Sequence, residues 1–226
     1  MHKAQIPQDI LDRVAKRRGR LHAYETIPAR QSALLVIDMQ NAYLTAGAPA
    51  EIPVGRSIVP NINRIATHMR TLGSPIVWIQ NTFYQGSEAE WPSYFELRDA
   101  KLGSAMKDAL AAESVGHALW AELDTQESDW RFKKCRYSAF HGSLGCTFAE
   151  RLRAAGIEYL VIVGTATNIC CESTARDAMM KNFKAVMISD ATATRSDQEQ
   201  VAALINMIQS FGDVYSTDEL IKCIRN

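Results

Sequence analysis

The sequence has no uninterrupted apolar run of about 18 residues, the length that a transmembrane helix needs, so we expect no membrane-spanning segment. It also has no excess of either charge, because 25 lysines and arginines balance 25 aspartates and glutamates. A neutral chain lacks the electrostatic footprint of a nucleic-acid-binding protein. The one local imbalance is the basic segment 16–20, which is either a contact for an anion or partner or the solvated end of a helix.

Cysteine is scarce, and its spacing suggests no pairing. The five cysteines are Cys135, Cys146, Cys170, Cys171 and Cys223. They form neither a disulfide framework nor a Cys-x-x-Cys pair, which predicts reduced thiols and a cytoplasmic protein. Residues 1–10 lack the apolar region of a signal peptide, in keeping with that location. We interpret Cys171, the neighbour of Cys170, as a packing residue.

The chain alternates apolar, strand-like runs with helical stripes. Its 226 residues, 47% of them hydrophobic, suffice for one core. We expect strands at residues 33–38, 75–80, 130–134, 159–163, 184–189 and 213–216. We expect helices at residues 7–19, 57–73, 143–155, 168–181 and 197–210. This alternation predicts an α/β protein, a three-layer α/β/α sandwich with a Rossmann-like, mostly parallel sheet of about six strands.

Two segments fall outside the alternation. Residues 1–30 form an N-terminal extension, partly helical, ahead of a single domain at 31–226. Residues 81–129 are the least regular part and contain clusters of aromatic residues. A stretch of that length is usually functional when it lies beside a site. It therefore forms either a lid or a subunit contact.

Three polar residues stand where strands are expected to end. The strand at 159–163 runs through small residues into a helix that carries Cys170 in its first turn. The unpaired N–H groups and partial positive charge of a helix N-terminus favour a thiolate. Asp38 and Lys134 end two other strands, and ligands bind at this carboxyl edge of parallel sheets. The alternative is that Cys170 is one more small buried residue.

Three motifs, in this order, resemble the isochorismatase-like cysteine hydrolase superfamily. They read LLVIDMQNAY at 34–43, KCRYSAF at 134–140 and GTATNICCESTARDA at 164–178. The resemblance implies the superfamily's Asp–Lys–Cys catalytic triad, formed here by Asp38, Lys134 and Cys170. Lys134 is chosen over Lys133 by the spacing of its motif, and strand alternation sends the two lysines to opposite faces.

The resemblance also implies a mechanism. Asp38 takes the proton of the Cys170 thiol, the sulfur attacks a carbonyl carbon, and the resulting thioester is hydrolysed. Lys134 holds the charges in place and, with the helix N-terminus, acidifies the thiol. In related enzymes backbone N–H groups stabilise the oxyanion. Here these would be the amides of Cys170 and Ala166, with a cis peptide bond between Thr165 and Ala166.

We expect no metal and no cofactor. Nicotinamidases of the superfamily bind a divalent metal through aspartate and histidine ligands after the second strand, where this chain reads QNTFYQG at 80–86. That segment contains neither histidine nor carboxylate. The histidines are scattered without ligand spacing at His2, His22, His68, His117 and His141.

The motifs look most like the branch of ureidoacrylate and N-carbamoylsarcosine amidohydrolases. Members that act on carbamoylated amino acids bind the substrate carboxylate through an arginine in the loop after the next strand, where this chain has Arg195. The alternative is that Arg195 only pairs with Asp197 or Glu199. Residues placed by position in the pocket, each of which could equally be core, are Asn41, Tyr43, Trp78, Asn81 and Tyr137.

Together these features predict a cysteine-dependent amidohydrolase. It would release ammonia from a small carbamoyl, ureido or amide compound that bears a carboxylate. The alternatives are a metal-independent nicotinamidase-like or broad-specificity amidase, and a non-catalytic family member that serves as a binding or assembly subunit. By analogy with the family we expect a homodimer or homotetramer that binds a small-molecule substrate and neither nucleic acid nor membrane.

Overall fold

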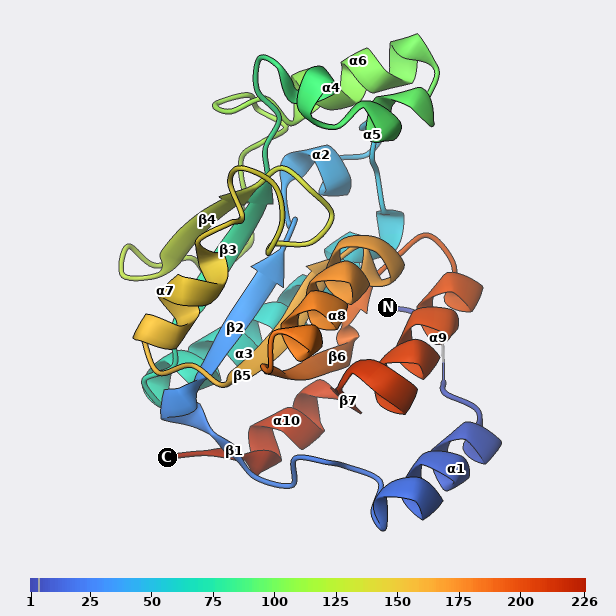
Figure 1. The fold of residues 1–226 in the computed structure, drawn as a ribbon, viewed down its shortest axis with the longest axis vertical. Helices are drawn as coiled ribbons and strands as arrows, with labels where there is room; N and C mark the ends of the chain where they lie inside the picture. Colours follow the sequence, from blue (N-terminus) through green and yellow to red (C-terminus); the bar gives the residue numbers. More distant parts are fainter. Residues whose placement is uncertain (4) are drawn as a thin grey trace.

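The computed structural model describes residues 1–3 and 5–226 and confirms the three-layer α/β/α architecture (Figure 1). A six-stranded parallel sheet has the order β4-β3-β2-β5-β6-β7. Its strands are β2 Ser32–Ile37, β3 Ile76–Asn81, β4 Trp130–Lys134, β5 Tyr159–Thr165, β6 Lys184–Ala193 and β7 Asp213–Tyr215. A small second sheet pairs β1, Ile27–Pro28, with β8, Ile224–Arg225.

Helices cover both faces of the large sheet. They are α1 Gln8–Arg18, α2 Asn41–Leu44, α3 Val59–Thr71, α4 Ser87–Glu90, α5 Pro92–Glu96, α6 Ala100–Ala109, α7 Phe148–Ala154, α8 Glu172–Met180, α9 Asp197–Asn206 and α10 Thr217–Cys223. Shorter helical turns are η1 Ala29–Gln31, η2 Pro53–Ile58, η3 Thr167–Cys171 and η4 Met207–Phe211. Across the described residues, no helix combines the length and the apolar character needed to cross a membrane.

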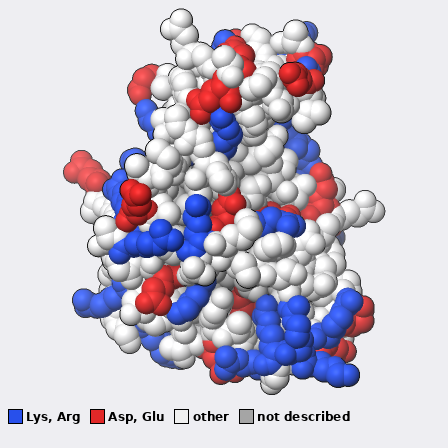
Figure 2. Space-filling view, viewed as in Figure 1, with Lys and Arg blue, Asp and Glu red and all other residues white. Residues whose placement is uncertain are grey.

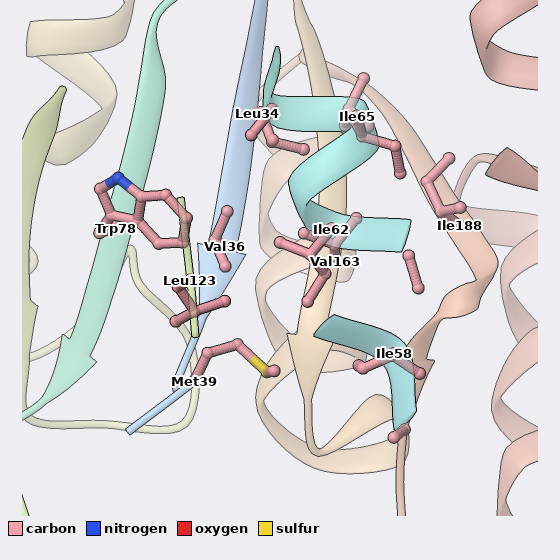
Figure 3. Packing of buried hydrophobic residues seen from close by; sticks show 14 of the residues in the cluster. Leu34, Val36, Met39, Ile58, Ile62, Ile65, Trp78, Leu123, Val163 and Ile188 are labelled. Carbon is pink, nitrogen blue, oxygen red and sulfur yellow. The ribbon is translucent and has the colours of Figure 1, made fainter. Parts of the chain in front are cut away.

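The central strands read as continuous apolar runs because both of their faces are buried. In β2 every residue is buried, and alternate side chains enter two different cores. Leu34 and Val36 pack with Ile62 and Ile65 of α3, as Figure 3 shows. The alternate residues, such as Leu35, face the core formed with α7, α8 and α9. The side chains of β2 therefore contact the helical layers on both faces of the sheet.

Two predicted element boundaries were wrong by more than two residues. The helix expected at 143–155 begins only at Phe148, because glycines keep the preceding segment in turns. Gly142 has a φ of +77°, and a side chain at Gly145 would meet the His141 carbonyl oxygen at 2.4 Å. The strand expected at 184–189 continues to Ala193, because β6 shifts its register and goes on pairing with the end of β5.

The basic segment 16–20 contributes to the fold, which favours its interpretation as a helix end. Arg18 donates to the carbonyls of Ile208 and Gly212 at 2.5 and 2.9 Å, next to the end of η4. It also pairs at 3.3 Å with the fully buried carboxylate of Asp213. Figure 2 shows a cluster of basic side chains at the end of the molecule where α1 lies. The Arg18 side chain therefore joins the N-terminal extension to the rest of the domain.

The irregular segment 81–129 contains a compact cap, residues 84–110, built from α4, α5 and α6. Figure 1 shows the cap beyond the carboxyl ends of β2 and β3. A hydrogen bond of 2.9 Å from the Phe83 amide to the Leu110 carbonyl closes its base. The cap therefore lies at the sheet edge where the sequence predicts the site.

Candidate active site

The fold brings Asp38, Lys134 and Cys170 to one edge of the sheet. Asp38 follows β2 directly, Lys134 ends β4, and Cys170 lies in η3 just after β5. Since β3 separates β4 from β2, the long Lys134 side chain reaches across the end of β3. Lys133 is exposed whereas Lys134 is fully buried, as strand alternation predicts.

The three side chains form a buried ion pair with a thiol beside it. Lys134 Nζ lies 2.8 Å from Asp38 Oδ2 and 3.3 Å from Cys170 Sγ. It also donates to the Arg136 carbonyl at 3.0 Å. The Asn81 amide donates to Asp38 Oδ1 at 3.0 Å. Asp38 and Lys134 are completely buried and Cys170 is 5% exposed, so water screens these charges little.

The backbone around Asp38 aims its carboxylate. Asp38 has a φ of 51°, a left-handed conformation that few residues other than glycine, asparagine and aspartate adopt. Its amide still donates to the Ile79 carbonyl at 2.9 Å, and its carbonyl accepts from Thr165 Oγ1 at 2.9 Å. The residue is therefore held by both neighbouring strands as the chain leaves β2.

Burial sets the protonation of the resting site. It raises the pKa of the Asp38 carboxyl above its usual value, and the nearby Lys134 charge opposes that rise. Burial and the Asp38 carboxylate also raise the pKa of the Cys170 thiol to about 12, again opposed by Lys134. For Lys134, burial works against the charge, but Asp38 and Cys170 outweigh it and raise its pKa. The expected acidification of the thiol was therefore wrong for the resting site, because the sequence does not show the depth of burial.

This raised pKa predicts a distinctive alkylation profile. Because the pKa of Cys170 is about 12, its reaction with iodoacetamide should speed up about tenfold per pH unit from pH 7 to 10. An unperturbed thiol, such as that of a cysteine in a short peptide with blocked ends, should level off above its pKa of about 8.5. Peptide mass spectrometry gives the rate at Cys170, and circular dichroism confirms that the fold persists. A plateau near pH 7 would contradict a protonated resting thiol.

A tight turn carries the chain from β5 to Cys170. Gly164 has a φ of +109°, and a side chain there would meet the Ile37 carbonyl oxygen at 2.1 Å. The peptide bond between Thr165 and Ala166 is cis, as the resemblance implied. Ala166 lines the same cavity as Cys170. The two amides expected to stabilise an oxyanion thus belong to one turn.

A small cavity of about 70 Å³ opens onto Cys170 beneath the cap. Its lining includes four of the residues predicted to contact substrate, Tyr43, Asn81, Tyr137 and Arg195. Asn81 Nδ2 donates to Tyr43 Oη at 2.9 Å, whereas the buried Asn81 Oδ1 has no partner among the described residues. A residue of the cavity lining therefore keeps a buried acceptor without a partner among the described residues.

Arg195 does not form the ion pairs that were its alternative role. Within the described part of the chain Arg195 has no salt bridge, while Asp197 pairs with His2 at 2.7 Å. Glu199 interacts with Ser196 at the start of α9. The exposed Arg195 guanidinium is therefore available at the cavity.

Two predicted pocket residues lie elsewhere. Trp78 is fully buried in the core under α3, where its indole N–H donates to Asp129 at 2.8 Å. It stands three positions before the end of β3, too far back to reach the carboxyl edge. Asn41 donates from its side chain to the Val115 carbonyl at 2.9 Å and so fixes a loop.

Sequence reasoning missed the contribution of the cap. Tyr94, Arg98 and Met106 line the cavity from the cap, whereas the sequence of that segment indicates only a cluster of aromatic residues. Residues from α5 to α6 lie far from the triad in sequence and carry no motif. No local pattern could have placed Arg98 on the same cavity lining as Cys170.

The sequence predicted that no metal is bound, and this stays a prediction. Among residues 1–3 and 5–226, no group of three or more His, Cys, Asp or Glu side chains is arranged to hold a metal ion. Where nicotinamidases carry ligands, Gln80 and Thr82 instead hydrogen-bond to His117. Burial lowers the pKa of His117, which favours its neutral form.

Solved structures share this fold. A cysteine hydrolase from Pseudomonas syringae pv. phaseolicola 1448A superposes with a TM-score of 0.77 at 24% identity, covering 87% of this chain and 93% of its own. N-carbamoylsarcosine amidase from Thermoplasma acidophilum superposes with a TM-score of 0.67 at 23% identity, covering 83% and 97%. At these identities the likeness shows the fold alone.

Sequence comparison shows the family as well as the fold. The ureidoacrylate amidohydrolase RutB of Variovorax paradoxus (strain S110) is 34% identical over 208 residues, which cover 86% of this chain and 81% of the relative. RutB of Yersinia enterocolitica serotype O:8 / biotype 1B is 34% identical over 211 residues, covering 87% and 90%. The isochorismatase domain family matches residues 32–219, most of the chain. The chain therefore belongs to the isochorismatase family.

Proposed function

We propose that this protein is a cysteine-dependent amidohydrolase. It cleaves a C–N bond, other than a peptide bond, in a small ureido, carbamoyl or amide compound that bears a carboxylate, and it releases ammonia. The observation that carries the proposal is the Lys134 ammonium, placed 2.8 Å from Asp38 and 3.3 Å from Cys170, together with the position of Cys170 on the lining of a small, partly enclosed cavity. The amidohydrolase names of the two RutB relatives support the same class of reaction.

The first half-reaction transfers the acyl group to sulfur. The Cys170 proton passes to Asp38 as the sulfur bonds to the carbonyl carbon, so a free thiolate need not accumulate. The raised pKa of Asp38 makes it a better base than an exposed carboxylate. Asp38 then gives this proton to the departing nitrogen, and ammonia leaves. The product is a thioester, or a thiocarbamate when the substrate is a ureido compound.

The second half-reaction restores the thiol. Asp38 takes a proton from water, whose oxygen attacks the thioester carbon, and the C–S bond breaks as Cys170 regains a proton. The product is a carboxylic acid, or a carbamic acid from a ureido substrate. Lys134 stays charged throughout, because its pKa is raised, and it balances the negative charge that moves between Asp38 and Cys170.

The cavity wall supports a substrate with an amino group at one end and an acid at the other. The unpartnered Asn81 Oδ1 can accept from a substrate –NH₂. Arg195 offers a planar fork that matches a carboxylate. The small volume, about 70 Å³, favours compact substrates over extended ones.

The test is ammonia release from a panel of carbamoyl amino acids, ureidoacrylate analogues, nicotinamide and simple amides. We expect turnover of a ureido acid, and Arg195→Ala should lower kcat/KM for it by about 10-fold or more while changing simple amides little. Arg151→Met, a charge removal on the exposed face of α7, serves as the control. Turnover of nicotinamide alone would contradict the substrate class. No turnover of any compound would favour the non-catalytic alternative.

A further inference from the structure

The cavity carries more positive charge than the triad accounts for. Within the triad, the Lys134 ammonium and the Asp38 carboxylate balance each other, and Cys170 is held as a neutral thiol. Among the described residues, the only charged side chains on the cavity lining are those of Arg98 and Arg195. Neither forms a salt bridge within residues 1–3 and 5–226. The cavity lining thus carries two guanidinium groups that no acidic side chain of the described residues compensates.

Of the two, Arg98 is the more firmly held. It lies between α5 and α6, where its guanidinium stacks 3.5 Å from the centre of the Tyr94 ring. It donates to the Tyr94 carbonyl at 2.5 Å and to Tyr137 Oη at 3.3 Å. Its neighbour Asp99 is engaged in capping α6 through the Leu102 amide. Arg98 is half-buried and held by these contacts, whereas Arg195 is exposed.

These contacts leave Arg98 able to bind an anion. A guanidinium has five N–H donors, and the two hydrogen bonds above leave the others free. A half-buried, pre-oriented fork loses little freedom on binding a carboxylate and is less screened by water than an exposed one. Tyr137, which accepts from Arg98, follows the catalytic Lys134 by three residues. Arg98 is thereby hydrogen-bonded both to the cap and to the segment that follows β4.

We propose that Arg98 is the principal residue that binds the anionic group of the substrate, with Arg195 as a second contact at the mouth. The cap would then determine specificity, because it supplies the charge that selects acids over neutral amides. This inference rests on the proposed function for the identity of the substrate, but its physical content is a selectivity for anions at Cys170.

The test measures alkylation of Cys170 by iodoacetate and by iodoacetamide at pH 9, in the wild type, Arg98→Met, Arg98→Lys and Arg151→Met. Arg151 is the matched control, since its guanidinium also stacks on an aromatic ring, Trp130, at 4.4 Å, away from the cavity. Arg98→Met should slow iodoacetate about 10-fold to 100-fold and leave iodoacetamide within about 2-fold. The iodoacetate rate of Arg98→Lys should lie between those of Arg98→Met and the wild type. Arg151→Met should react with both reagents at the wild-type rates.

The outcomes separate this inference from the proposed function. An equal change with both reagents would show a structural role for Arg98 and overturn the inference, as would no change with either. An iodoacetate-selective loss, with no ammonia release from any compound, would uphold the anion site and reject the amidohydrolase. Turnover of a ureido acid by the wild type, with no iodoacetate-selective loss in Arg98→Met, would support the amidohydrolase and overturn the anion site. Thermal unfolding confirms that each variant is folded.

Discussion

Lys134→Met should lower the free energy of unfolding by about 3–5 kcal/mol, the cost of leaving a buried charge without its partner. Asp38 is completely buried, and among the described residues only Lys134 forms an ion pair with it, at 2.8 Å. Burial already raises the pKa of Asp38, and removing the ammonium raises it further. The folded variant then binds a proton that the unfolded chain releases, so its stability should decline as pH rises above about 4. Urea unfolding at pH 5 and pH 8 measures both effects.

A double variant distinguishes charge from packing. Asp38→Asn with Lys134→Met removes both charges and should recover most of the lost stability, while ammonia release stays at least about 10³-fold below wild type. Equal instability of the single and double variants would mean that Lys134 acts through packing. Wild-type stability of Lys134→Met at pH 8 would contradict a buried ion pair.

Cys170→Ser should reduce kcat by about 10⁴-fold or more, with little change in stability. Serine nearly preserves the volume of a buried residue, but its hydroxyl is far less acidic than even the raised thiol, whose pKa is about 12. Asp38, a carboxylate, is too weak a base to activate it. The rate is measured as ammonia release from the best substrate of the panel.

Intact-protein mass spectrometry supplies the second readout for this variant. Acid quenching of the wild type during turnover should trap an adduct with the mass of the acyl group on Cys170, and Cys170→Ser should show none. Cys171→Ser is the matched control, since Cys171 is buried next door with its sulfur 3.9 Å from the Val163 carbonyl. An adduct that persists in Cys170→Ser, or turnover within about tenfold of wild type, would reject this nucleophile.

The sequence predicted the residues at strand ends far better than those within strands or on the cap. Asp38 and Lys134 stand at the ends of β2 and β4, where a parallel sheet must present them. Asn81 ends β3 and lines the cavity, whereas Trp78, three residues earlier on the same strand, is in the core. The distance of a residue from the carboxyl edge is therefore more informative than the strand to which it belongs.

Two features lay beyond the reach of local patterns. The cap residue Arg98 reaches the site only through tertiary packing on Tyr94 and Tyr137, which no periodicity encodes. The protonation of Cys170 depends on how completely the cap and the sheet exclude water. Its position at a helix N-terminus suggested an acidic thiol, but the loss of hydration has the larger effect and raises the pKa of Cys170.

The sheet order has a mechanical consequence. β4 lies at the margin of the sheet and, among the described residues, is bonded only to β3, yet it carries the lysine that compensates the buried carboxylate. Outer strands fray at a lower free energy than the strands at the centre. A brief opening of β4 would withdraw Lys134 from Asp38 while β2 and β5 stayed intact. Inactivation by heat or denaturant should then precede global unfolding, as a local event at this margin.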